Sequence, residues 1–223
     1  MPPPESSGRQ LSRTGTLGFR KNAPGKVPFI AFYHSLNIYR HQVIKQADVL
    51  LAMFLFGNEF SLEAKRRNFE FYDPLTTGDS SLSSCIEAIV ALEIGEYDKA
   101  VKYARAALLM DLADVGGNVK DGCHIASMGG TWMVFAYGFG GLRDYHGELS
   151  FRSQRPPEAQ ASLHFPITWR GQLLDVDISP DSTTYTLREG EALTIRHDAE
   201  EIALNRQTPS IVRPTLEPLK KIA

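Results

Sequence analysis

The spacing of apolar residues changes once along this sequence, near Arg152, and that change limits the folds that the chain can adopt. Before it, apolar residues recur every three or four positions, which is the period of an amphipathic helix. After it, apolar and polar residues alternate, as in strands with one buried face. We therefore expect a mainly α protein with a C-terminal β domain, with helices over residues 36–152 and a small antiparallel β domain over residues 160–207.

A helical stripe that ends at Phe54 predicts the first helix, from Asn37 or Arg40 to Phe56. Further helical signals cover residues 62–69, 82–94, 96–114 and 125–141. The second and third of these segments are separated by a single glycine, so they should form an antiparallel helix pair. Leu108 is expected on the inner face of that pair.

The segment 125–141 is apolar all round and rich in small residues, which is typical of a helix packed on several sides. Trp132 is therefore expected in the core. In the β part, hairpin turns are predicted at Arg170-Gly171 and Glu189-Gly190. Residues 1–35 are expected to form a disordered or unrelated leader, and the Pro-rich tail, 208–223, to be loose.

Charge and cysteine content exclude several classes of protein. The 223 residues carry a formal net charge of −2, so the basic excess of a nucleic-acid binder is missing. The two cysteines, Cys85 and Cys123, provide neither a disulfide framework nor metal-ligand spacing. The apolar run that ends at Phe56 is far shorter than the roughly 20 residues of a membrane span. We expect a cytoplasmic protein with no metal, no nucleic-acid partner and no membrane partner.

Three polar segments stand beside predicted helix starts, where free N–H groups attract anions. IKQADV contains Lys45 and Gln46, which can donate to sugar hydroxyls. The other two contain hydroxyls and an imidazole: GDSSLSS with Ser80 and Ser81, and KDGCHIASMGGTW with His124 and Ser127. The simpler reading of the serines is that they cap a helix, through a Ser84–Glu87 capping box or with Ser81 or Ser83 as the cap. The simpler readings of Lys45 and His124 are that the lysine is solvated and the histidine structural.

Together, these motifs resemble the C-terminal part of glycoside hydrolase family 65, the family of the maltose, trehalose and kojibiose phosphorylases. They are KQADV, DSSLS, DG.HIASM.G.W and GFGG.R, in this order, followed by the transition GELSFRSQRPPEAQASLHFPITWRGQLLDVDI. The resemblance covers roughly residues 38–200. It implies that residues 36–152 form the C-terminal portion of an (α/α)6 barrel (toroid), followed by the β domain.

The resemblance also implies an activity and site residues. Lys45 and Gln46 would bind glucose at the subsite where the bond is cleaved. The phosphate-binding side would consist of Ser80, Ser81, His124 and Ser127. The implied reaction is phosphorolysis, or hydrolysis, of an α-glucosidic disaccharide such as maltose, trehalose or kojibiose. Inorganic phosphate would be a co-substrate, and no cofactor is implied.

An inverting phosphorylase also needs a carboxylic acid that protonates the leaving oxygen. In the family this glutamate precedes the Lys-Gln motif, whereas here the preceding residues contain one acid, Glu5, which matches nothing. We therefore expect no catalytic general acid in this chain and no activity of the chain alone. The expected partners are the disaccharide and phosphate, with either a separate chain carrying the N-terminal half or a further copy. The alternative is a non-catalytic carbohydrate-binding or interaction remnant.

Overall fold

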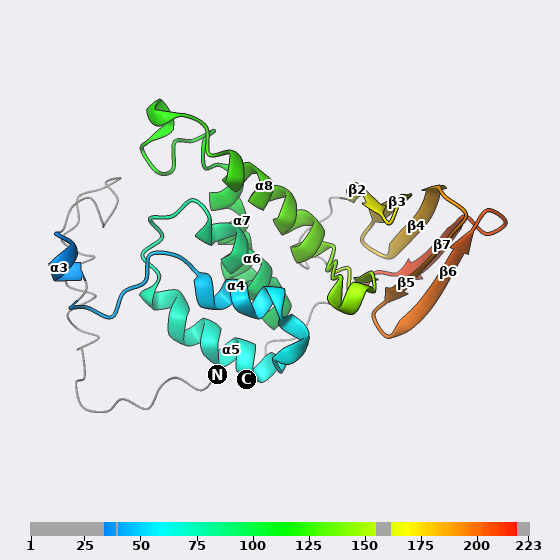
Figure 1. The fold of residues 1–223 in the computed structure, drawn as a ribbon, viewed down its shortest axis with the longest axis horizontal. Helices are drawn as coiled ribbons and strands as arrows, with labels where there is room; N and C mark the ends of the chain where they lie inside the picture. The colour runs from blue at the N-terminus through cyan, green and yellow to red at the C-terminus, as the bar shows by residue number, and fades with distance from the viewer. Residues whose placement is uncertain (1–33, 39, 155–161, 218–223) are drawn as a thin grey trace. The chain divides into compact units, whose positions relative to one another are not determined.

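The structure is a computed structural model that describes residues 34–38, 40–154 and 162–217. The chain divides into two compact units, Met1–Trp132 and Met133–Ala223. The first is helical and the second consists mainly of strands (Figure 1). Most of the expected leader, nearly all of the sequence between the two predicted parts, and the end of the tail lie outside the described residues.

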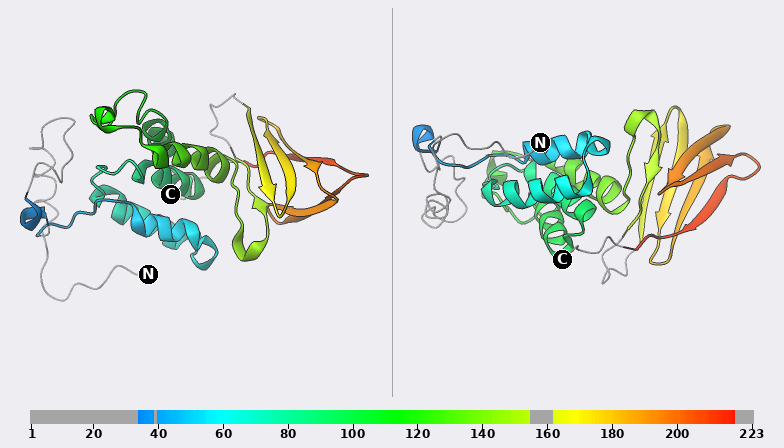
Figure 2. Two further views of the ribbon diagram at one scale, coloured as in Figure 1. Left: turned by 45° about the horizontal axis from the view of Figure 1, so that its top comes forward. Right: turned by 90° about the horizontal axis from the view of Figure 1, so that it is seen from below.

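Helix α6 is the centre of the first unit, because it packs against three other helices, α4, α5 and α7 (Figure 2). Ten of its twelve residues are buried, as expected for a helix that is apolar on all sides. The helices are α3 (Ser35–Ile38), α4 (Asp48–Leu55), α5 (Leu62–Tyr72), α6 (Ser83–Ile94), α7 (Tyr97–Leu108) and α8 (Ile125–Met133). Short 3-10 turns lie at η1 (Gly57–Glu59), η2 (Asp73–Leu75) and η3 (Val119–Asp121).

The first long helix, α4, begins at Asp48, so the predicted start at Asn37 or Arg40 is wrong. The backbone just before α4 pairs instead with a distant segment, through a parallel β-bridge between Ile44 and Thr76. These backbone groups are therefore unavailable for intrahelical bonds. As a result, the Lys-Gln motif lies in the connection that leads into α4, and not within the helix.

Helices α6 and α7 form the predicted pair. Gly95 ends α6 with a φ of 82°, a left-handed conformation that glycine adopts without strain, and α7 begins two residues later. Ala100 and Ala107 are buried on the inner face of α7. Leu108, predicted on that face, is 47% exposed. It is the last residue of α7 and lies about 100° around the helix from Ala107, which turns it towards solvent.

Helix α8 is packed on one face only, so the prediction of a helix covered on several sides is wrong. Ser127 and Gly130 are buried, whereas Ile125, Met128 and Trp132 are exposed by 70%, 49% and 45%. The prediction that Trp132 lies in the core is therefore also wrong. The small residues allow close packing on their own face, and the large apolar residues lie on the opposite face.

The second unit contains two sheets. Its helical turns are η4 (Val134–Phe139), a π-helix, and η5 (Tyr145–Gly147). Its strands are β1 (Ser150–Phe151), β2 (Leu163–Trp169), β3 (Gln172–Ile178), β4 (Ser182–Glu189), β5 (Ala192–His197), β6 (Glu200–Asn205) and β7 (Ser210–Pro214). One sheet has the order β1-β5-β6 and the other β2-β3-β4-β7. The pairs β2–β3, β3–β4 and β5–β6 are antiparallel, as predicted for residues 160–207. Strand β1, which precedes that range, pairs with β5 in parallel.

Both sheets contribute to one apolar core, as in a small β-sandwich. Phe151 and Tyr185 pack against each other within it, with ring centroids 5.1 Å apart and the ring planes tilted by 45°. The predicted hairpin turn at Arg170-Gly171 is confirmed, because it joins the antiparallel pair β2 and β3. The predicted hairpin at Glu189-Gly190 is wrong, because the turn at Gly190 connects β4 to β5, which lie in different sheets and do not pair. The tail was predicted to be loose, but β7 pairs with β4 along its length. Strand β7 is at the edge of its sheet, where its final residue, Pro214, lacks an N–H without loss of a ladder bond.

Both cysteines are free thiols; Cys85 is buried and Cys123 exposed. Within the described ranges, no helix is long and apolar enough to cross a membrane.

Candidate functional site

Gln46 and Ser80 lie 34 residues apart in the sequence and are joined by a hydrogen bond. Gln46 Nε2 donates to Ser80 Oγ at 2.9 Å, and Leu82 N donates to the same oxygen at 3.3 Å. One residue after Gln46 and three after Ser80, Ala47 N donates to Ser83 Oγ at 3.3 Å. These bonds fasten the Lys-Gln connection to the loop before α6, so two of the polar segments predicted from the sequence meet in space.

The serines before α6 do not act as its cap. Helix α6 begins at Ser83, and the residue at its N-cap position, Leu82, makes no side-chain cap bond. Ser84 therefore lies inside the helix, and the predicted capping box with Glu87 is absent. Ser81 is half-buried. The hydroxyls of Ser80 and Ser83 therefore accept hydrogen bonds from the Lys-Gln connection instead of capping α6.

Lys45 is exposed and has no hydrogen bond or ion pair recorded with the described residues. A cavity of about 120 Å³ adjoins the next residue, and it is lined by Gln46, Ala47, Asp48, Leu51, Leu82 and Ile86. This volume is below the roughly 300–1,000 Å³ of ordinary ligand pockets. By itself, the cavity is too small to hold a disaccharide.

His124 is held by two side chains that the sequence motifs did not include. Its Nδ1 lies 2.6 Å from Asp111 Oδ1, and its backbone N donates to Asp111 Oδ2 at 2.8 Å. Its Nε2 lies 3.2 Å from Asn118 Nδ2. The hydrogen bonds from the side chain and backbone of His124 lower the pKa of the Asp111 carboxyl. Because a carboxylate only accepts hydrogen bonds, Asp111 holds the imidazole with a proton on Nδ1. Nε2 is then the ring nitrogen that can exchange one partner for another.

Ser127 carries a hydroxyl that is buried and has no hydrogen-bond partner. Its backbone N donates to His124 O at 2.9 Å, so Ser127 lies in the first turn of α8 and His124 immediately precedes the helix. Gly130 lies one turn further on the same face, where an added Cβ would be 2.6 Å from Cys85 Sγ. The face of α8 that carries Ser127 therefore packs against the beginning of α6, just after Ser80 and Ser81.

The structure thus joins Gln46 to Ser80, and His124 to Ser127. A common pocket for all six predicted residues stays a prediction. Asp111 and Asn118 were missed because they are 13 and 6 residues from His124 and belong to no recognisable spacing pattern. Within the described ranges, no group of three His, Cys, Asp or Glu side chains could hold a metal ion.

Comparison with protein-family models identifies both parts of the chain. The model of the glycosyl hydrolase family 65 central catalytic domain matches residues 9–133, and that of the family's C-terminal domain matches residues 142–204. The first match starts within the segment 1–35, for which no resemblance was seen. The two matched models follow each other along the chain, and both describe domains of a class of glycosyl hydrolases. The chain belongs to glycosyl hydrolase family 65.

Several named relatives are phosphorylases. An α,α-trehalose phosphorylase of Thermoanaerobacter brockii is 43% identical over 80% of this chain and 23% of its own length. A maltose phosphorylase of Bacillus subtilis is 35% identical over 84% of this chain and 25% of its own. A solved structure described as a proposed kojibiose phosphorylase from the human microbiome has a TM-score of 0.78 and 30% identity. That match covers 87% of this chain and 28% of the other. The chain thus spans about a quarter of the length of the curated relatives that it matches.

Proposed function

We propose that the helical unit is the sugar- and phosphate-binding portion of a phosphorylase that transfers the glucosyl group of an α-glucosidic disaccharide to inorganic phosphate. The observation that carries this proposal is the 2.9 Å hydrogen bond from Gln46 to Ser80. It joins a residue of the predicted glucose subsite to one of the predicted phosphate side. Because the two substrates of a phosphorylase must meet at one carbon atom, their binding groups must be neighbours.

On the sugar side, Lys45 and Gln46 donate hydrogen bonds to glucose hydroxyls. The Lys45 ammonium has three donors and is exposed, so it is free to turn towards a ligand. The Gln46 carboxamide is already oriented by its bond to Ser80, which reduces the conformational entropy lost when sugar binds.

On the phosphate side, Ser80, Ser81, His124 and Ser127 surround the anion at the starts of α6 and α8. The buried, unpartnered hydroxyl of Ser127 supports this role, because a phosphate oxygen would satisfy it. His124 Nε2 is already close to the Asn118 amide. In the neutral ring Nε2 accepts from that amide, so phosphate binding requires either a P–OH group that donates to Nε2 or a protonated ring that donates to a phosphate oxygen, while Asp111 keeps the imidazole in position.

The reaction needs a carboxylic acid that protonates the leaving oxygen while phosphate attacks the opposite face of the sugar. No residue of this chain is assigned that role. We place the acid outside these 223 residues, in the rest of the family fold, with the reaction in the cytoplasm. Under this proposal α4–α8 are part of an (α/α)6 barrel. The exposed apolar residues of α8, Ile125, Met128 and Trp132, would then face other barrel helices.

The proposal is tested by binding and by turnover. Nuclear magnetic resonance titration of the 223-residue chain with trehalose, maltose, kojibiose and phosphate should shift the Gln46 side-chain amide and the His124 imidazole. Lys45→Ala should weaken sugar binding by about tenfold, which is the effect of one charge-assisted hydrogen bond of about 1.4 kcal/mol. Lys102→Ala, an exposed lysine on α7, serves as the matched control and should leave binding unchanged.

Turnover separates the possible roles of the chain. Disaccharide and phosphate with the chain alone should release no glucose 1-phosphate, because the general acid supplies at least 10²–10⁴-fold in rate. Rapid release by the pure chain would disprove the need for an outside acid. Glucose released equally with and without phosphate would indicate a hydrolase. If neither sugar nor phosphate shifts Gln46 or His124, the binding role is refuted.

A further inference from the structure

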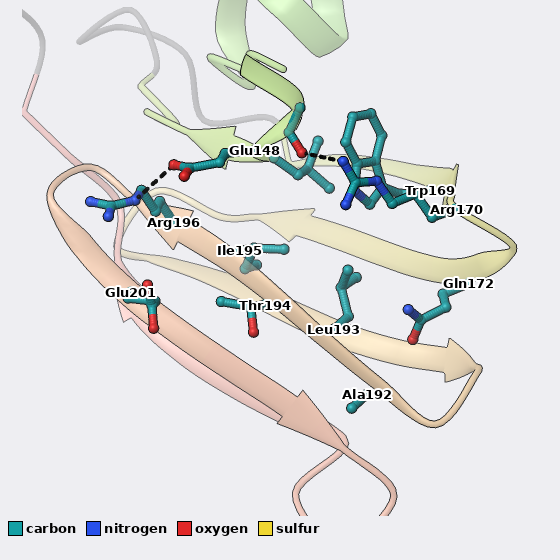
Figure 3. Close-up of a pocket in the computed structure, with 12 residues that line it drawn as sticks. Glu148, Trp169, Arg170, Gln172, Ala192, Leu193, Thr194, Ile195, Arg196 and Glu201 are labelled. Carbon is teal, nitrogen blue, oxygen red and sulfur yellow. Dashed lines mark hydrogen bonds and ion pairs between the residues drawn. The ribbon is translucent and has the colours of Figure 1, made fainter. Parts of the chain in front are cut away.

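The β unit contains a larger cavity than the helical site, and no role has been assigned to it. Its volume is about 300 Å³, at the lower end of the range for ligand pockets. Figure 3 shows its lining, which comes from the turn before β1, the β2–β3 hairpin, and strands β5 and β6. All of these residues belong to the second compact unit, so the pocket shares no residue with the candidate phosphorylase site.

The polar lining carries no net charge. Arg170 and Arg196 are offset by Glu148 and Glu201. Arg196 Nε lies 3.5 Å from Glu148 Oε2, and Arg170 Nη2 donates to a backbone carbonyl, that of Gly147, at 2.9 Å (Figure 3). Because the positive and negative groups balance and both arginines already have partners, the pocket does not favour an ionic ligand. It favours an uncharged molecule with many hydroxyls, which can bridge such groups.

One edge of β5 is open beside the pocket. β5 pairs with β6 along its length but with β1 only at Arg196 and His197. Arg196 N donates to Leu149 O at 2.9 Å, so the backbone N–H and C=O of Arg196 point to the edge of β5 that faces β1. Because every second residue of a strand points its backbone groups to the same edge, those of Thr194 and Ala192 also point there. These groups lie beyond the short β1, where they add donors and acceptors to the pocket.

Two further side chains fit a sugar ring. The Trp169 indole forms part of the wall, and Arg170 lies over it, with its guanidinium carbon 5.5 Å from the ring centroid (Figure 3). An aromatic wall with a few fixed polar groups is the usual composition of a small-molecule site. Gln172 Oε1 is buried and accepts no hydrogen bond. A hydroxyl of a ligand in the pocket could donate to that oxygen and satisfy it.

We propose that this pocket of the β unit is a second carbohydrate site, which binds one uncharged glucose ring of an α-glucoside. The balanced charges exclude anions, the open β5 edge and Gln172 bind hydroxyls, and Trp169 covers the apolar side of the ring. The free edge between Ala192 and β1 is only a few residues long, which is too short for a stable peptide strand. The site would hold a sugar without acting on it.

Fluorescence provides a direct test, because the chain has two tryptophans and the compact units contain one each. In the variant Trp132→Phe, the remaining emission comes from Trp169. Titration of this variant with glucose, maltose and trehalose should change that emission in a saturable manner at millimolar sugar. Chemical shifts of the Gln172 side-chain amide should move at the same sugar concentrations.

Substitutions then locate the site. In the same background, Gln172→Leu and Thr194→Val should each weaken sugar binding by about tenfold, equivalent to about 1.4 kcal/mol. Thr168→Val, an exposed threonine of β2 outside the pocket, is the matched control and should bind normally. Lys45→Ala should also leave the Trp169 response intact, which separates this site from the proposed phosphorylase site.

Several results would overturn the proposal. They are no Trp169 response to any sugar, equal weakening by Thr168→Val, and loss of the response in Lys45→Ala. A response to phosphate or sulfate but not to glucose would show an anion site instead. A response to an extended peptide but not to sugar would show strand pairing at the β5 edge.

Discussion

Removal of one buried hydroxyl should destabilise the β unit by a measurable and specific amount. Tyr185 is fully buried, and its OH lies 2.8 Å from His197 Nδ1. On the other side of the ring, His197 Nε2 lies 3.0 Å from Pro214 O. A carbonyl only accepts, so Nε2 must carry the proton and Nδ1 must accept from Tyr185. The pair therefore has one possible arrangement when the histidine is neutral.

Tyr185→Phe removes the donor and leaves His197 Nδ1 buried without a partner. An unsatisfied buried acceptor costs about 1–3 kcal/mol, whereas the phenyl ring keeps most of the apolar packing. For a unit of this size, each kcal/mol lowers the Tm by roughly 4–8 °C. The control is Thr186→Val, the next residue of the same strand, whose hydroxyl bonds to Ser210 Oγ at the surface. It should change stability by less than about 0.5 kcal/mol.

Urea unfolding in the Trp132→Phe background measures this effect, because emission then reports the β unit through Trp169. The midpoint should fall for Tyr185→Phe while the slope with denaturant stays constant. If Tyr185→Phe and Thr186→Val shift the midpoint equally, the buried hydrogen bond contributes nothing specific, and the reasoning from its geometry is refuted.

Two further predictions concern acid and packing. Burial lowers the pKa of His197, against opposing effects of the Pro214 hydrogen bond and nearby carboxylates, so the folded β unit holds it neutral. The stability that the neutral His197 contributes is complete above the pKa of an unfolded histidine, about 6.5, and is lost as the pH falls below that value. The midpoint of urea unfolding, followed by Trp169 emission, should therefore drop between about pH 7.5 and 5.5, and an unchanged midpoint would contradict this. In the helical unit, Gly130→Ala would place a Cβ 2.6 Å from Cys85 Sγ and 2.9 Å from Cys85 Cβ, and should cost about 1–3 kcal/mol by thermal unfolding. Adding Cys85→Ala removes the sulfur contact but keeps the Cβ, so it should restore part of this loss; no recovery at all would show that the sulfur contact is not the cause.

The periodicity of apolar residues determined the class of fold. The helix pair α6–α7 and the hairpin turn at Gly171 follow from signals within a few residues of each other, namely spacing and glycine conformation. At Gly190 the same signals predicted a turn but not that the chain passes there from one sheet to the other. Such local signals survive in any context that buries the apolar face. The family was also evident from the order of the short motifs, and the family models confirm it.

Pairing between distant segments was beyond local signals. Helix α4 begins later than predicted because the residues before it pair with Thr76. Strand β7 forms within the tail that was predicted to be loose, because its backbone pairs with β4. The exposed side of α8 was also mispredicted. Burial of an apolar residue such as Trp132 is favourable, but the local sequence does not show which neighbouring element, if any, covers it.

The candidate site divides in the same way. The chain itself determined which polar residues flank helix starts, including Lys45, Gln46 and His124. Tertiary structure alone decided that Gln46 bonds to Ser80 and that Asp111 orients the imidazole. Hydrogen bonds between side chains depend on directions and distances within a few tenths of an ångström. Those quantities are set when whole helices pack, which is why no spacing along the chain encodes them.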